Sequence, residues 1–147
     1  SPSSAASDVY KRQLPVVSMH EVPKEQVVHY GIMHGVWESP KEEQMRLDCI
    51  YEKPTVDYAE ENLGIRCKNG SKYFAVFGQY ILTEDVYKVL EKNIRENNES
   101  RGEIQLTDAL EEVRATTGMM GCRIKGKSYD VGLPQMYIET VREFGRI

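Results

Sequence analysis

Apolar residues along the chain follow two spacings, one typical of strands and one typical of helices. Stretches rich in β-branched, aromatic and other apolar residues predict strands at residues 14–22, 31–37, 45–51 and 72–82. Apolar residues three and four positions apart predict helices at residues 56–63, 86–94, 106–113 and 133–144. Strands interleaved with helices predict an α/β fold with a mixed sheet.

Residues that favour turns and helix ends divide these stretches. Pro23 suits the first turn of a short helix over residues 23–30. Thr55 and Thr83 are predicted N-caps, because a threonine hydroxyl can accept a hydrogen bond from the first turn of a helix. An Asn-Gly turn is expected before the longest strand. Residues 119–129 are predicted to form a pair of strands.

The last predicted helix carries a continuous apolar stripe. Its members are Leu133, Met136, Tyr137, Val141 and Phe144. We interpret this stripe as core packing, with contacts in a self-associated protein as the alternative. The sequence alone does not choose an oligomeric state.

Composition and charge exclude several classes of protein. The chain has 147 residues, a net charge of −4 and a sequence pI near 5.5, which argues against a broad surface for nucleic acid or for an anionic membrane. Its apolar runs are far shorter than the roughly 20 residues that span a bilayer. No signal peptide is visible. Three scattered cysteines and three histidines fit no standard metal spacing.

Residues 1–13 differ from the rest of the chain. They are rich in serine and alanine, show no periodicity and lack an initiating methionine. We interpret them as an artefactual or disordered tail and place the folded part at residues 14–147.

The stretch CIYEKP, residues 49–54, ends a predicted strand with two opposite charges. Pro54 stops the strand, and ligand sites of open α/β sheets gather where strands end. At such an edge Glu52 can accept hydrogen bonds from sugar hydroxyls, and Lys53 can meet a phosphate. Taken alone, the pair is better explained as a solvated surface ion pair.

The other candidate positions, each taken alone, also allow both a functional and a structural interpretation. Asp130, in SYDVG, is placed for Mg²⁺ or is a turn aspartate bonded to its own backbone. Gly31 and Gly78 let a ligand approach the backbone, or mark bulges. Lys125 and Lys127 lie in a basic stretch that is expected to be an exposed hairpin, where either could neutralise a phosphate.

Taken in order, these pieces resemble one enzyme family. The segments EVPKEQVVHYGIM, YEKP, FAVFGQYIL, GEIQLTDAL and GKSYDVGLPQMYIETVREF resemble the bacterial-type UTP–glucose-1-phosphate uridylyltransferases, or UDP-glucose pyrophosphorylases. The resemblance covers residues 14–144. It implies the C-terminal part of a nucleotide-diphospho-sugar transferase domain, with a Rossmann-like three-layer α/β architecture.

The resemblance also implies roles for individual residues. Glu52 would bind the glucose hydroxyls and Lys53 the phosphate of glucose 1-phosphate, while Gly31 and Val76 would line the sugar pocket. Asp130 would be a ligand of Mg²⁺, and with Lys53 it would serve catalysis. In the GEIQLTDAL signature, Glu103 and Asp108 would orient the loop and helix near the site.

The family's Gly-rich GxGTR-type loop, which wraps the nucleotide phosphates, does not occur in these residues. The resemblance therefore implies that the nucleotide-binding half is missing and that this stretch alone is inactive. UTP and UDP-glucose would be partners of the full-length protein, which is expected to be cytoplasmic and homo-oligomeric. The alternatives are a glucose-1-phosphate thymidylyltransferase, a related transferase, or a non-catalytic module that binds a sugar phosphate.

Overall fold

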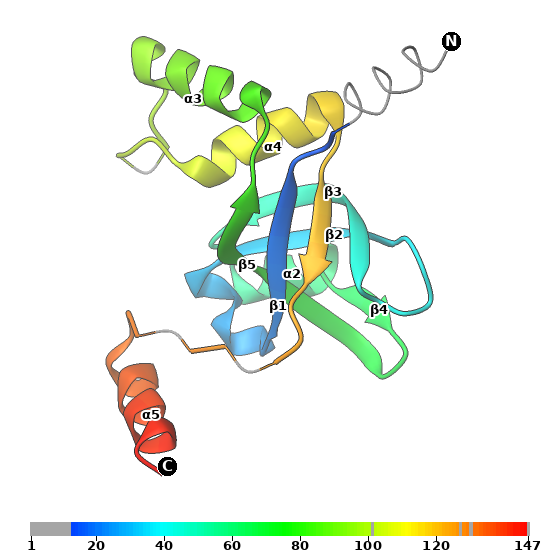
Figure 1. Ribbon diagram of the computed structural model, residues 1–147, viewed down its shortest axis with the longest axis vertical. Coiled ribbons are helices and arrows are strands. Elements are labelled where there is room, and N and C mark those ends of the chain that lie inside the picture. Colours follow the sequence, from blue (N-terminus) through cyan, green and yellow to red (C-terminus); the bar gives the residue numbers. More distant parts are fainter. Residues whose placement is uncertain (1–12, 101, 127, 130, 147) are drawn as a thin grey trace, which may run out of the picture.

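The computed structural model describes residues 13–100, 102–126, 128–129 and 131–146. Its strands are β1 (Val16–Val22), β2 (Gly31–Trp37), β3 (Gln44–Glu52), β4 (Ile65–Cys67), β5 (Gly70–Ile81) and β6 (Met120–Arg123). Its helices are the 3₁₀ helix η1 (Lys24–His29), α2 (Val56–Asn62), α3 (Glu84–Glu96), α4 (Leu106–Thr117) and α5 (Pro134–Phe144) (Figure 1). All four predicted strands and all four predicted longer helices are present, as is the short helix after Pro23.

The strands form one mixed sheet, as predicted for an α/β fold. Its order is β1-β6-β3-β2-β5-β4, and β1 also pairs with β5. Strands β1 and β6 run parallel, whereas the other pairs are antiparallel. Within this order β2 lies between β3 and β5, so the start of β2 meets the end of β3, where Gly31 pairs with Glu52.

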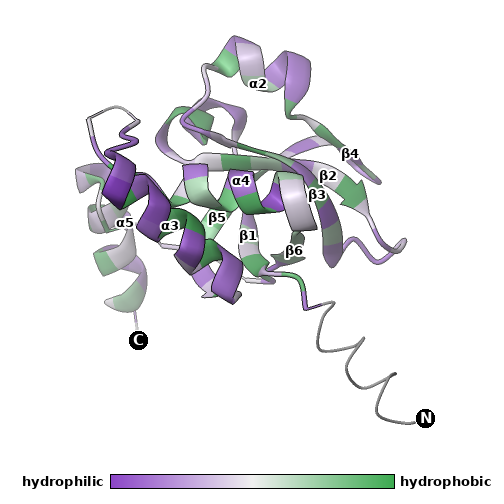
Figure 2. Ribbon diagram, turned by 90° about the horizontal axis from the view of Figure 1, so that it is seen from above, coloured by the Kyte–Doolittle hydropathy of each residue, from purple (hydrophilic) through white to green (hydrophobic). Residues whose placement is uncertain are grey.

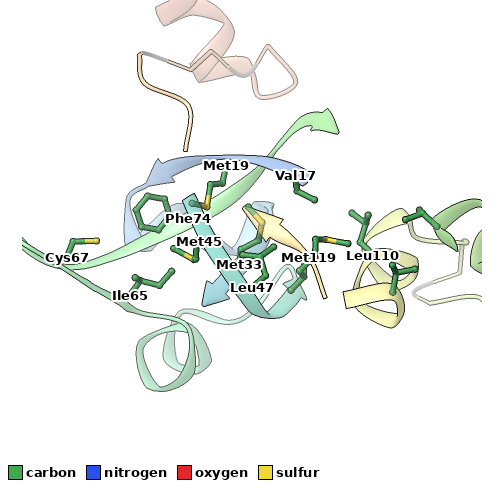
Figure 3. Close-up of a cluster of buried hydrophobic side chains, with 13 residues drawn as sticks. Val17, Met19, Met33, Met45, Leu47, Ile65, Cys67, Phe74, Leu110 and Met119 are labelled. Carbon is green, nitrogen blue, oxygen red and sulfur yellow. The ribbon is translucent and has the colours of Figure 1, made fainter. Parts of the chain in front are cut away.

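The core lies where the inward faces of these strands meet. Figure 3 shows Met19, Met33, Met45 and Phe74 gathered between the strands, with Leu110 extending the cluster toward α4. All five side chains are fully buried. Methionine is flexible enough to fill the irregular spaces that a twisted mixed sheet leaves.

Helices α3 and α4 lie side by side at one end of the sheet (Figures 1 and 2). Helix α3 ends at Asn97, which adopts a left-handed conformation with φ 52°. Buried Ala109, Leu110 and Val113 direct one face of α4 toward β3. This contact brings the GEIQLTDAL segment to the strand that carries Glu52.

Two local expectations are corrected by the structure. Thr83 occupies the N-cap position of α3, but its hydroxyl makes no capping hydrogen bond, because it is turned inward and buried. The expected strand pair after residue 118 is a single strand, β6, and the described residues 124–126 and 128–129 add no second strand. Instead β6 pairs with the distant β1 and β3.

The apolar stripe of α5 is not core packing. None of the described residues of this helix is buried, and Tyr137, Val141 and Phe144 are each more than half exposed. Figure 1 shows α5 set apart from the sheet. The prediction failed because helical spacing reports an apolar face without identifying what covers it.

The described helices are all too short or too polar to cross a membrane.

Candidate functional site

Three of the predicted sugar-pocket residues meet where β2 begins. Gly31 is buried opposite Glu52, its partner across the β2–β3 pair. A Cβ atom added at Gly31 would lie 3.0 Å from Glu52 Oε2 and 3.3 Å from Val76 Cγ2. A side chain at position 31 would therefore press on the Glu52 carboxylate and on Val76, and one of them would have to shift.

A fourth residue, Thr107, completes this cluster. Its hydroxyl donates a hydrogen bond of 2.7 Å to Glu52 Oε2, and its methyl group would lie 3.5 Å from a Cβ at Gly31. Thr107 lies in the first turn of α4, inside GEIQLTDAL. Sequence reasoning selected Glu103 and Asp108 from that segment and missed Thr107. The available signal was a hydroxyl in the first turn of a helix that follows a motif-rich loop.

Lys53 follows Glu52 in a tight turn. Its backbone has φ 47°, in the left-handed region, and its N–H donates to Tyr30 O at 2.9 Å. The side chain is exposed, whereas the following Pro54 is buried. The left-handed residue and the proline end the strand together, so the chain leaves the sheet immediately after the Glu-Lys pair.

Tyr80 on β5 senses the charge of Glu52. Burial raises the pKa of the Tyr80 phenol, and the negative charge of Glu52 raises it further. Tyr80 also packs against the main hydrophobic core. The Glu52 carboxylate thus accepts a hydrogen bond from Thr107, and its negative charge acts on the half-buried Tyr80 phenol.

Two hollows flank this cluster: Val76 lines one of about 450 Å³, and Glu52 lines a separate one of about 360 Å³. Tyr30 and Val76 line one part of the larger hollow, and Tyr129, Val131 and Met136 line another. Carboxylate, hydroxyl and apolar groups next to a hollow are the combination that binds polyhydroxylated ligands, and an exposed ammonium suits a phosphate.

The remaining predicted residues are distributed as follows. Glu103 accepts a hydrogen bond from Gln105 at 2.6 Å and exchanges backbone hydrogen bonds with Ser100, so it shapes the loop before α4. Asp108 is exposed beside the smaller hollow, which Glu52 also lines. Gly78 lies at an irregularity of the β1–β5 register, which agrees with its interpretation as a bulge.

The predicted metal ligand, Asp130, lies outside the described residues, as does Lys127. Lys125 is exposed and paired with Glu43 at 2.5 Å. In the described part of the chain, no three acidic, histidine or cysteine side chains are grouped to hold a metal ion.

Comparison with known proteins identifies relatives of the chain. The sequence model of the nucleotidyl transferase family matches residues 5–145. The UTP–glucose-1-phosphate uridylyltransferase of Pseudomonas aeruginosa is 32% identical over 125 residues, which is 85% of this chain and 39% of that protein. The enzyme of the same name from Bacillus subtilis is 29% identical over 138 residues, covering 93% of this chain and 42% of that protein.

Solved structures agree with this relationship. A crystal structure of UDP-glucose pyrophosphorylase complexed with UDP-glucose superposes with a TM-score of 0.73 at 31% identity, covering 97% of this chain and 48% of that one. UTP-bound UGPase from Acinetobacter baumannii gives a TM-score of 0.63 at 26% identity, covering 95% of this chain and 42% of that one. The chain therefore spans less than half the length of these relatives.

Proposed function

Because the chain belongs to the nucleotidyl transferase family, we propose that it forms the glucose 1-phosphate-binding part of a UTP–glucose-1-phosphate uridylyltransferase. The observation that carries the proposal is that Gly31 lies between the Glu52 carboxylate and the Val76 side chain. Further support comes from the two sequence relatives, which are both named UTP–glucose-1-phosphate uridylyltransferase.

In the proposed site each residue has a separate task. The Glu52 carboxylate accepts hydrogen bonds from glucose hydroxyls, and Gly31 and Val76 form the wall against which the sugar ring lies. The Lys53 ammonium neutralises the phosphate as a point charge. Lys53 is exposed in the turn that directly follows Glu52, next to the proposed sugar contact.

The proposed reaction is nucleotidyl transfer. A phosphate oxygen of glucose 1-phosphate attacks the α-phosphorus of UTP in line, pyrophosphate leaves, and UDP-glucose forms. Such a reaction needs positioning and charge neutralisation from the protein and requires no protein nucleophile. Glu52 and Lys53 would supply these for one of the two substrates.

We further propose Asp130 as a ligand of Mg²⁺. Nucleotidyl transfer generally uses a divalent metal, which when bound neutralises phosphate charge. Support comes from the chain neighbours of Asp130, since Tyr129 and Val131 both line the hollow beside Val76. Carboxylates are the protein ligands that magnesium prefers.

Calorimetric titration of glucose 1-phosphate into the chain tests the proposal. We expect binding to the unmodified chain and a loss of about 10- to 100-fold in affinity for Lys53→Ala, the range for losing a hydrogen bond to a charged group. Lys68→Ala, which removes another exposed lysine, is the matched control and should bind normally. If Lys53→Ala binds glucose 1-phosphate with the affinity of the unmodified chain, Lys53 does not belong to the site.

Transfer itself is tested in a chimera that carries residues 14–146 in place of the corresponding region of the Bacillus subtilis relative. Pyrophosphate release from UTP with glucose 1-phosphate, lowered about 10- to 100-fold in kcat/KM by Lys53→Ala, supports the enzyme. Binding of glucose 1-phosphate without any transfer would favour a non-catalytic module. A parallel assay with dTTP tests the choice of UTP.

A further inference from the structure

Two hydrogen bonds join α4 to the end of β3. Thr107 Oγ1 donates to Glu52 Oε2 at 2.7 Å, and the backbone N–H of Ile50 donates to Glu111 Oε2 at 2.9 Å. On the helix, Thr107 and Glu111 are four positions apart and share one face. On the strand, Ile50 and Glu52 are two positions apart and have the same orientation. The helix and the strand are therefore held in register at two successive points.

The Glu111 contact takes the place of a missing neighbouring strand. β6 pairs with β3 only over Gln44–Arg46, followed by one hydrogen bond from Leu47 N to Met119 O. Ile50 lies beyond this pairing and is only 4% exposed. A buried backbone N–H needs an acceptor, and here the acceptor is a side-chain carboxylate from α4.

Arg114 fixes the orientation of that carboxylate. Its Nε donates to Glu111 Oε2 and its Nη2 to Glu111 Oε1, both at 2.8 Å. The Arg114 side chain is only 17% exposed, so the bidentate pair is partly shielded from water. Glu111 therefore has little freedom to release Ile50.

We infer that Glu111 is a positioning residue for the sugar-binding site. It fixes the end of β3 against α4, so that the Thr107 hydroxyl meets the Glu52 carboxylate and holds it in one orientation. The inference rests on the proposed function, in which Glu52 binds glucose hydroxyls. Glu111 lines the smaller hollow together with Glu52, but the effect inferred for it passes through Ile50, Glu52 and Thr107.

The first test needs no ligand and uses NMR on the labelled chain. Glu111→Ala should speed hydrogen exchange at the Ile50 amide about tenfold or more, since a hydrogen bond to a charged group is lost. Scalar couplings should show the Thr107 χ1 angle averaging over several rotamers. Glu111→Gln, which keeps one acceptor oxygen, should give a smaller change in both quantities.

Glu112→Ala is the matched control on the same helix. Glu112 is next in sequence and pairs with Lys92 at 3.0 Å in an exposed ion pair between α3 and α4. Its removal should leave the Ile50 exchange rate and the Thr107 rotamer unchanged. A folded Glu111→Ala or Glu111→Gln chain with unchanged Ile50 exchange and a fixed Thr107 rotamer would overturn the inference.

The second test is a double-mutant cycle on glucose 1-phosphate affinity. Thr107→Val should weaken binding about tenfold in the unmodified chain and by less than about twofold once Glu111→Ala is present, because both changes release the same carboxylate. Thr107→Ser should restore binding. Additive effects would make Glu111 a structural residue only and overturn the inference.

The two tests separate the inference from the proposed function. If the unmodified chain binds no glucose 1-phosphate, the proposed function fails at this site. The exchange rate of Ile50 and the rotamer of Thr107 then still decide whether Glu111 positions the Glu52–Thr107 pair.

Discussion

At the scale of single residues, Glu52 is the carboxylate on which the proposed sugar site depends. CIYEKP alone was better explained by a surface ion pair, and only the ordered motifs favoured a site. The structure gives Glu52 a buried glycine opposite, a hydroxyl donor and an apolar wall, which a solvated ion pair does not need. Thr107 was missed because its contact with Glu52 joins residues 55 positions apart, and its only local signal was a hydroxyl in the first turn of a helix.

The titration of Tyr80 reports the charge of Glu52. Its folded pKa is raised, so the folded chain holds the phenol proton more tightly than the unfolded chain. This contribution to stability is therefore present below the ordinary tyrosine pKa and is lost as the pH rises through the folded value.

Glu52→Gln should lower the pKa of Tyr80 without returning it to the ordinary value, because burial is the larger cause and remains. The measurement is a pH titration of the tyrosine ring carbons by NMR, with Tyr80→Phe to assign the signal. Glu112→Gln serves as a distant control. An unchanged Tyr80 pKa in Glu52→Gln would mean that the carboxylate does not face the phenol.

At the scale of elements, apolar spacing predicted the strands and helices whose positions depend on neighbouring residues in the sequence. β2 and α4 have clear apolar spacing and were found at nearly the predicted bounds. The errors concern long-range partners. β6 was expected in a local strand pair, yet its partners β1 and β3 lie far away in sequence. The apolar face of α5 was likewise assigned to a core that it does not reach.

The two predicted N-caps should respond differently to the same change. Thr55 Oγ1 accepts from Tyr58 N at 3.2 Å, so Thr55→Val should lower the free energy of unfolding by about 1 kcal/mol. The buried Thr83 hydroxyl has no hydrogen-bond partner among the described residues, so Thr83→Val should be neutral or stabilising.

Urea denaturation of the two variants measures both effects. An unchanged dependence of the free energy of unfolding on urea concentration shows that the transition stays two-state. A larger loss of stability for Thr83→Val than for Thr55→Val would contradict the conclusion that Thr55 caps its helix and Thr83 does not.

At the scale of the whole molecule, the described residues hold the proposed site, and the chain belongs to a family with relatives more than twice as long. The proposed sugar-phosphate residues could be named from the sequence because they lie in short motifs on β2, at the end of β3 and on β5. The oligomeric state, the cytoplasmic location and the Mg²⁺ site of Asp130 stay predictions. They depend on surfaces, compartments or residues beyond the described part of the chain.

The most direct measurement is an NMR titration of the isotope-labelled chain with glucose 1-phosphate, following every backbone amide. We expect the largest chemical-shift changes at Gly31, Lys53, Val76 and Thr107, and we expect Glu52→Gln to weaken all of them together. Chemical-shift changes confined to α5 and the residues before it would contradict the claim that this site binds the sugar phosphate. The absence of any shift change at millimolar glucose 1-phosphate would contradict it as well.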